Sequence, residues 1–200
     1  YLNQDFNQVF KVYTGNKDVN GGDGFAFLFK GNSSLIVGGA GGGMGYQGIS
    51  PSIAFEFDTY ENSGNGDLAT DHFAVHTGGD PSTTGRLGNN IDLGNLEDSV
   101  WHDCIIDWNH STKTITVTFD GIVIYTLTRD IVNLDFGGNP IVSFGFTAST
   151  GAAYNEQAVC VTEVSYVPCQ AGAVSPILST TTACGGSTVD LNSLVTSTTP

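Results

Sequence analysis

The sequence predicts an all-β fold, an antiparallel sandwich of two sheets, and three observations lead to that prediction. Short runs rich in phenylalanine, isoleucine, valine and threonine alternate with glycine, asparagine and aspartate, as strands alternate with turns. The 200 residues include 27 glycines and 12 phenylalanines, and only 13% are charged, which is typical of one well-packed domain. No segment of helical length repeats its apolar residues every 3.6 positions.

The expected strands follow one another in order along the chain. The first two carry recurring phenylalanines, the third is a short apolar run, and the fourth and fifth flank an acidic loop. The sixth holds Trp101 and Trp108, whose spacing of seven residues places them on opposite faces. An Asp120-Gly121 turn then joins a hairpin, and two further apolar runs complete the sandwich. The expected ranges are 6–13, 24–29, 35–37, 52–58, 72–76, 101–108, 114–119, 122–127, 141–147 and 158–167.

A change of composition after Pro168 indicates a domain boundary. The chain before it is rich in aromatic residues, whereas the segment after it is rich in serine and threonine. We therefore expect one domain over residues 1–168. Residues 169–200 are expected to be a linker or the truncated start of a following Ser/Thr-rich repeat module.

Four cysteines and few lysines are typical of an oxidising exterior, so we expect a secreted or cell-surface protein. Cys169 and Cys184 are close enough in sequence to form a local disulfide. Cys104 and Cys160 lie in expected strands, where they either bridge adjacent strands or remain two buried free thiols. Spacing leaves both alternatives open.

The charge of the chain excludes two classes of partner. Six basic residues against 20 acidic ones give a formal net charge of −14, which repels nucleic acid and anionic lipid surfaces. No apolar run approaches the roughly 18 residues of a membrane span, so membrane insertion is not expected.

Two acidic side chains project from one face of an expected strand. Glu56 and Asp58 are two residues apart, so both carboxylates leave the same face, while Phe55 and Phe57 occupy the other. Two adjacent acids repel each other unless a cation or a shared proton neutralises them. This spacing favours a bound cation at that face.

The loop and strand that follow supply further ligand types. They add Asn62, Asp67 and His72. Oxygen ligands favour calcium, and carboxylates with one imidazole suit manganese or a similar divalent ion. Two adjacent metals sharing Asp58 and Asp67 are therefore one hypothesis. The alternative is that aspartate and asparagine are present because they suit turns, and that His72 is an ordinary strand residue.

Four motifs in this order resemble the L-type (legume-type) lectins. They are GGDGFAFLF, GGGMGYQGI, IAFEFDTYEN with Asp67 and His72 after it, and FGFTASTGAAYNE, and they span roughly residues 6–168. The resemblance implies a concanavalin-like jelly-roll sandwich with a curved front sheet. It also implies a non-catalytic carbohydrate-binding domain that anchors a larger secreted or surface protein to glycans.

The resemblance further implies two metal sets. Calcium would be bound by Asp58, the Tyr60 carbonyl, Asn62 and Asp67. A neighbouring Mn²⁺ or other divalent transition metal would be bound by Glu56, Asp58, Asp67 and His72.

The sugar site implied by the resemblance lies beside the calcium. Asp23 would accept hydrogen bonds from sugar hydroxyls, and the Gly22–Asp23 peptide before it should be cis. The remaining contacts would be a backbone donor from Gly43 or Gly42, the amide of Asn62, the ring of Tyr60, and loop contacts from Ala152 and Ala153.

Two rival functions compete with the lectin interpretation. Glu56, Asp58 and Glu61 match the E-x-D-x-x-E pattern of laminarinase-type retaining glycosidases, in which a strand bulge brings both glutamates to one face. The chain would then be an enzyme, although Asn62, Asp67 and His72 have no role in that mechanism. The second rival is a structural adhesion module that binds no sugar.

Overall fold

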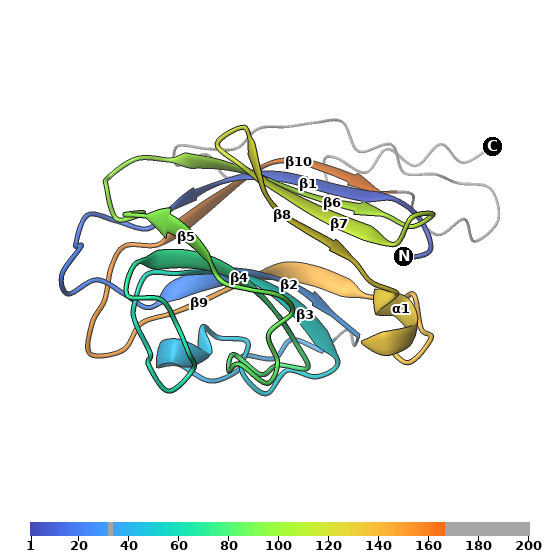
Figure 1. Cartoon of the computed structure of the whole chain (residues 1–200), viewed down its shortest axis with the longest axis horizontal. Helices are drawn as coiled ribbons and strands as arrows, with labels where there is room; N and C mark the ends of the chain where they lie inside the picture. The colour runs from blue at the N-terminus through green and yellow to red at the C-terminus, as the bar shows by residue number, and fades with distance from the viewer. Residues whose placement is uncertain (32–33, 167–200) are drawn as a thin grey trace.

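The computed structural model describes residues 1–31 and 34–166, which form two stacked antiparallel sheets (Figure 1). Sheet A has the strand order β10-β1-β6-β7-β8 and sheet B the order β5-β4-β3-β2-β9. The strands of sheet A are β1 (Phe6–Tyr13), β6 (His102–Asn109), β7 (Thr114–Phe119), β8 (Ile122–Thr128) and β10 (Ala158–Tyr166). Those of sheet B are β2 (Gly24–Lys30), β3 (Ser52–Asp58), β4 (Asp71–Thr77), β5 (Ile91–Gly94) and β9 (Ser143–Ser149). The predicted all-β sandwich is confirmed.

The core between the sheets is built largely from aromatic rings. Phe27 of β2 lies against Phe10 and Phe55, with ring centroids 6.1 Å and 5.9 Å apart. Phe25 and Phe57 are paired across β2 and β3, and their rings stack at 4.9 Å. Each buried ring contributes roughly 1.5–3 kcal/mol, and a one-residue slip would move these rings out of the core. The phenylalanines therefore fix the register of the strand that carries Glu56 and Asp58.

The opposite face of sheet B is covered by a loop. Residues 38–49, which include the 3-10 helix η1 (Gly41–Gly43), pass beneath the sheet in Figure 1. Met44, Tyr46 and Ile49 from this loop form a second buried cluster with Leu28 and Ala54 from the sheet. Both faces of β3 are therefore buried, and its acidic residues lie under protein.

The structure corrects several of the expected elements. Residues 35–37 form no strand, and Leu35 is fully exposed. The short strand β5 and the one-turn helix α1 (Ile131–Leu134) were not predicted, and β9 begins at Ser143. Trp101 lies just before β6, where it is 43% exposed and its ring contacts Tyr13, whereas Trp108 is buried. The Asp120-Gly121 turn joins β7 to β8 as predicted, with both residues at positive φ.

Neither alternative for Cys104 and Cys160 is correct. Cys104 is a buried free thiol facing the core from β6. Cys160 on β10 is disulfide-bonded, so it cannot be paired with the free Cys104 and is not a free thiol. The predicted Cys169–Cys184 pairing and the predicted boundary after residue 168 both fall on residues outside the described ranges.

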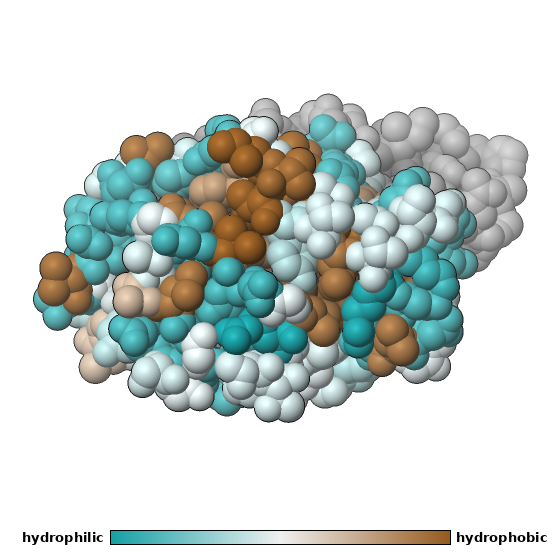
Figure 2. Space-filling view, viewed as in Figure 1, coloured by the Kyte–Doolittle hydropathy of each residue, from teal (hydrophilic) through white to brown (hydrophobic). Residues whose placement is uncertain are grey.

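Apolar side chains gather on the face of the molecule that Figure 2 shows. Figure 2 shows them over β8, where Ile122 and Val123 are 69% and 58% exposed. β8 is the edge strand of sheet A, and hydrophilic groups cover much of the face around it. Within the described residues, no helix has the length and hydropathy needed to cross a membrane.

Candidate functional site

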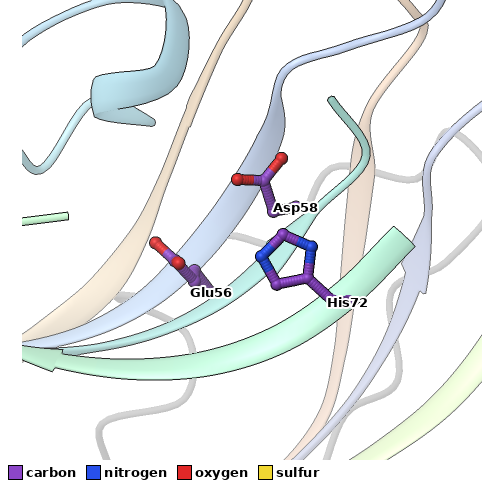
Figure 3. A group of neighbouring side chains, drawn as sticks. All are labelled: Glu56, Asp58 and His72. Atoms are coloured by element: carbon purple, nitrogen blue, oxygen red, sulfur yellow. The ribbon is translucent and has the colours of Figure 1, made fainter. Parts of the chain in front are cut away.

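Three potential metal-ligating side chains meet on the covered face of sheet B (Figure 3). Glu56 and Asp58 project from β3, and His72 is the cross-strand neighbour of Asp58 on β4. One ligand atom from each residue lies within 4.8 Å of the others, and each residue is only 1% exposed. The two-residue spacing in the sequence correctly predicts that the two carboxylates share a face.

The imidazole of His72 is held in an orientation suited to metal binding. Its Nδ1 lies 3.2 Å from the Thr70 carbonyl, which fixes Nδ1 as the donor. Its Nε2 is buried and has no hydrogen-bond partner among the described residues, although it lies 3.8 Å from Asp67 Oδ1. A buried nitrogen with a free lone pair beside carboxylates is the arrangement that a bound cation satisfies.

The loop after β3 turns further oxygen atoms toward this group. Asp58 Oδ1 accepts a hydrogen bond from Tyr60 N at 2.8 Å, and Asp67 Oδ2 accepts one from Asn62 N at 2.9 Å. The side-chain Oδ1 of Asn62 is buried and has no hydrogen-bond partner in the described part of the chain. Carboxylate and amide oxygens are the ligands that calcium prefers. The residues present therefore fit a divalent cation.

Electrostatics supports the same conclusion. Burial and the nearby charge of Glu56 raise the pKa of Asp58 well above its ordinary value. Burial also raises the pKa of Asp67, although the hydrogen bond from Asn62 opposes this shift. Buried like charges are unfavourable unless protons or a cation neutralise them. A divalent ion would remove this repulsion while leaving the carboxylates ionised.

Two partners of Glu56 were missed at the sequence level. The Tyr46 hydroxyl donates to Glu56 Oε2 at 2.6 Å, and His76 Nε2 lies 2.8 Å from Glu56 Oε1. Burial and the charge of Glu56 raise the pKa of Tyr46 far above its usual range, so it remains a donor. His76 follows His72 by four residues on one strand, so the two-residue period could have placed it on this face. No sequence signal identifies Tyr46, because its position depends on the path of the covering loop.

Asp23 lies at the edge of the metal group. It is 4% exposed, and its Oδ2 is buried with no hydrogen-bond partner among the described residues. The Gly22–Asp23 peptide is cis, as predicted. Burial raises the pKa of Asp23, and its charge contributes to the raised pKa of Asp58. An unpartnered buried carboxylate oxygen is available as an acceptor for a ligand hydroxyl.

Most of the predicted sugar-contact residues come together around Asp23. A Cβ added to Gly42 would overlap the Asn62 amide, and one added to Gly22 would lie 3.1 Å from the Tyr60 Cβ and 3.4 Å from that of Ala153. Ala152 is exposed on the same loop as Ala153.

The two glycines offered as backbone donors differ in their surroundings. Gly43 donates its N–H to the Ala40 carbonyl at 3.2 Å inside the turn. Gly42 instead lies against Asn62, and its carbonyl accepts from Asn65 Nδ2 at 3.4 Å. Gly42 is therefore the better placed of the two predicted donors.

Glu61 is separated from Glu56 by the end of the strand. β3 keeps a continuous register with both neighbouring strands and ends at Asp58. Glu61 is exposed in the following loop, where it lines a groove of about 530 Å³ with Tyr60 and Asp71. The bulge that would bring the two glutamates to one face is not present in β3.

Comparison with known protein families gives one match that covers most of the chain. The legume lectin beta-barrel domain, of the L-type lectin family, matches residues 1–163. Solved legume lectins have the same fold. Lectin II from Ulex europaeus is 25% identical, with a TM-score of 0.61 over 79% of this chain and 70% of that one. Peanut lectin, solved with a nine-residue peptide, is 25% identical, with a TM-score of 0.60 over 79% and 68%.

A structure of the Bauhinia forficata lectin in complex with GalNAc gives a TM-score of 0.62 over 78% of this chain and 70% of that one. At 19% identity, this similarity concerns the fold alone. Among curated proteins, the serine-rich adhesin for platelets of Staphylococcus aureus strain MSSA476 is 30% identical over 85% of this chain. The matched part is only 9% of the length of that adhesin, and 15% of the version from strain MRSA252.

Proposed function

This chain belongs to the L-type lectin family, and on that premise we propose that it is a calcium-dependent, non-catalytic carbohydrate-binding domain. The observation that carries the proposal is the meeting of Asp23, Asn62 and the buried acidic group in one place. Asp23 and Asn62 each hold a buried oxygen without a hydrogen-bond partner in the described part of the chain. A ligand hydroxyl, an ion or an ordered water would satisfy such atoms.

Calcium would be held by Asp58, the Tyr60 carbonyl, Asn62 and Asp67, and would neutralise the buried acids and fix the loop. The side chains of Asp58 and Asp67 already accept hydrogen bonds from the backbone of this loop. Once Asn62 Oδ1 is committed to the ion, its amide nitrogen is free to donate toward the sugar. The protein's own part is therefore to orient Asn62 between the ion and the ligand.

The proposed sugar site combines polar contacts with one aromatic ring. Asp23 accepts hydrogen bonds from sugar hydroxyls, and the Gly42 N–H and the Asn62 amide donate. The exposed Tyr60 ring packs on the C–H face of the sugar. Ala152 and Ala153 close one side without adding polar groups. This site buries little area, so we expect weak affinity for a single sugar and stronger binding through repeated units or copies.

A second divalent ion, Mn²⁺ or a similar metal, is proposed beside the first. Glu56, Asp58, Asp67 and His72 are its protein ligands. The buried His72 Nε2, which has no hydrogen-bond partner within the described ranges, supports this position. Glu56 is oriented there by the hydrogen bond from Tyr46, as ligating carboxylates usually are by outer hydrogen bonds, and His76 Nε2 lies beside its other oxygen.

We place this domain on a longer, secreted or surface-displayed protein that adheres to glycans. Two findings support this: the similarity to a serine-rich adhesin, and the small share of that adhesin which the domain matches. The net charge of −14 argues against nucleic acid as a partner.

A glycan array with and without EDTA, followed by calcium titration, tests the proposal. We expect binding to a defined set of glycans that EDTA removes and calcium restores. Asn62→Ala should abolish binding because it removes both an ion ligand and a sugar donor. Glu61→Ala is the matched control and should bind as the unmodified domain does.

Three results would overturn the proposal. If glycan binding is unaffected by EDTA, calcium has no role. If the domain hydrolyses a β-glucan and Glu61→Ala abolishes the hydrolysis, the chain is a glycosidase. If calcium raises thermal stability but no glycan binds, the chain is a structural adhesion module.

A further inference from the structure

Two loops distant in sequence lie side by side at the proposed sugar site. The first, residues 14–23, ends at Asp23, and the second, residues 150–157, carries Ala152 and Ala153. Asp23 N donates to the Ser149 carbonyl at 3.1 Å, and Gln157 Nε2 donates to the Gly22 carbonyl at 3.2 Å. These contacts set how far apart the two loops are at the positions where sugar would lie.

The side chain of Asn155 contacts the first loop across this junction. Its Oδ1 accepts from Asn16 N at 3.1 Å, and its Nδ2 lies 3.3 Å from the Lys17 carbonyl. A Cβ at Gly15 would overlap the Asn155 amide, so the glycine is needed for this close approach. Asn155 therefore connects the second loop to the first through both of its polar atoms.

Glu97 supports Asn155 from a third segment, between β5 and β6. Asn155 Nδ2 donates to Glu97 Oε1 at 2.7 Å, and Glu97 is 3% exposed. A Cβ at Gly21, two residues before Asp23, would overlap the same Glu97 oxygen. Glu97 therefore packs against the first loop and also accepts a hydrogen bond from Asn155, which connects the second loop to the first.

We propose that Asn155 and Glu97 are positioning residues for sugar binding, which fix Asp23 relative to the Ala152–Ala153 segment. This inference rests on the proposed lectin function. Neither residue belongs to the metal group. Glu97 also interacts with Thr59, next to Asp58, so calcium affinity is measured beside glycan affinity on each variant. A binding site loses affinity when its contacts move by more than about 0.5 Å, so loosening this junction weakens binding without removing a contact.

Asn155→Ala tests the junction in the whole domain at saturating calcium. We expect at least a tenfold loss of affinity for the glycans that the unmodified domain binds on the array, with calcium affinity changed less than about threefold. Glu156→Ala is the matched control, because Glu156 is the exposed neighbour on the same loop. It should leave both affinities unchanged.

An exchange of donor and acceptor separates positioning from general structural damage. Asn155→Asp alone removes the amide donor and places a second acid against Glu97, so glycan binding should fall at neutral pH. Adding Glu97→Gln restores a donor opposite an acceptor with similar volume. The double variant should recover part of the affinity that Asn155→Asp loses, because the Lys17 carbonyl stays without its donor, and a merely destabilised protein would recover none.

The possible results are distinguishable. If the unmodified domain binds no glycan, the proposed function fails, and the positioning role fails with it. If it binds glycan and Asn155→Ala binds equally well, the junction alone is refuted. If Asn155→Ala is unfolded, the double variant Asn155→Asp/Glu97→Gln decides. If it is folded and recovers none of the glycan affinity that Asn155→Asp loses, the inference is overturned. A parallel loss of calcium affinity also overturns it, because the residues would then act through the metal loop.

Discussion

Asp23 is a buried carboxylate whose proposed role is to contact the ligand rather than the ion. Its Oδ2 has no hydrogen-bond partner among the described residues, and Asp58, not Asp23, belongs to the metal group. We predict that Asp23→Ala removes glycan binding but preserves most calcium affinity. Glycan binding and calcium titration on the same variant would check this. Equal losses of both would show that Asp23 acts on the ion.

Tyr46 satisfies one oxygen of a buried glutamate, and its removal should destabilise the domain. Tyr46→Phe preserves the ring in the second cluster but leaves Glu56 Oε2 without its donor. A buried acceptor left without its donor costs about 1–3 kcal/mol. We predict a loss of that size in the free energy of unfolding, measured by denaturant titration. Tyr13→Phe, at a half-buried ring, is the control and should change little.

Residue spacing predicted that Glu56 and Asp58 share a face, but it did not predict the tyrosine that donates to Glu56. The alternation Phe55, Glu56, Phe57, Asp58 separates core from site, because strand side chains alternate between faces. Tyr46 could not be predicted, since it reaches Glu56 only after its loop has folded over sheet B. Asn155 and Glu97 were missed for the same reason: their contact joins segments 58 residues apart.

At the level of elements, the sequence located strands where burial is strong. β2 and β3 carry closely spaced phenylalanines and were predicted to within a residue. Residues 35–37 resemble a strand but pair with no strand in the described part of the chain, and they are exposed. β5 has the sequence IDLG, which is too short and too polar to give a signal. Pairing with β4 rather than propensity makes it a strand.

The junction of the three segments around Glu97 should respond to pH. Burial raises the pKa of Glu97 from 4.5 to about 7, helped by the charges of Asp71 and Asp18 and opposed by the hydrogen bond from Asn155. The folded-state pKa of Glu97 exceeds the unfolded value, so protonated Glu97 stabilises the fold. This stabilisation is complete below about pH 4.5 and is lost as pH rises through about 7. The full change is at most about 3 kcal/mol.

Glu97→Gln should remove this pH dependence. We predict that the free energy of unfolding of the unmodified domain, relative to that of Glu97→Gln, falls as pH rises from about 5 to about 8. Thermal melts in excess calcium would measure it, because the metal-loop acids are the same in both proteins and their titration cancels from the difference. Glu156→Gln, at an exposed glutamate, is the control. A stability difference that stays constant across this range would contradict the prediction.

At the scale of the whole molecule, the proposed calcium site would link stability to the ion. The chain carries a net charge of −14, and burial raises the pKa values of Asp23, Asp58 and Asp67. Binding at one hundred times the dissociation constant stabilises a folded protein by about 2.7 kcal/mol. For a domain of this size, that corresponds to a rise of roughly 5–10 °C in Tm.

The calcium-induced rise in Tm should itself depend on pH. The folded-state pKa values of Asp58 and Asp67 lie above their ordinary values, so protonation stabilises the metal-free fold as pH falls toward about 4. Protons then compete with calcium for the same oxygens. We predict that the difference in Tm between excess calcium and EDTA is large at about pH 7.5 and small at about pH 5. Asp58→Asn should lose most of the difference at both pH values, whereas Glu61→Gln should retain it. A difference that does not change with pH would show that calcium acts away from these buried acids.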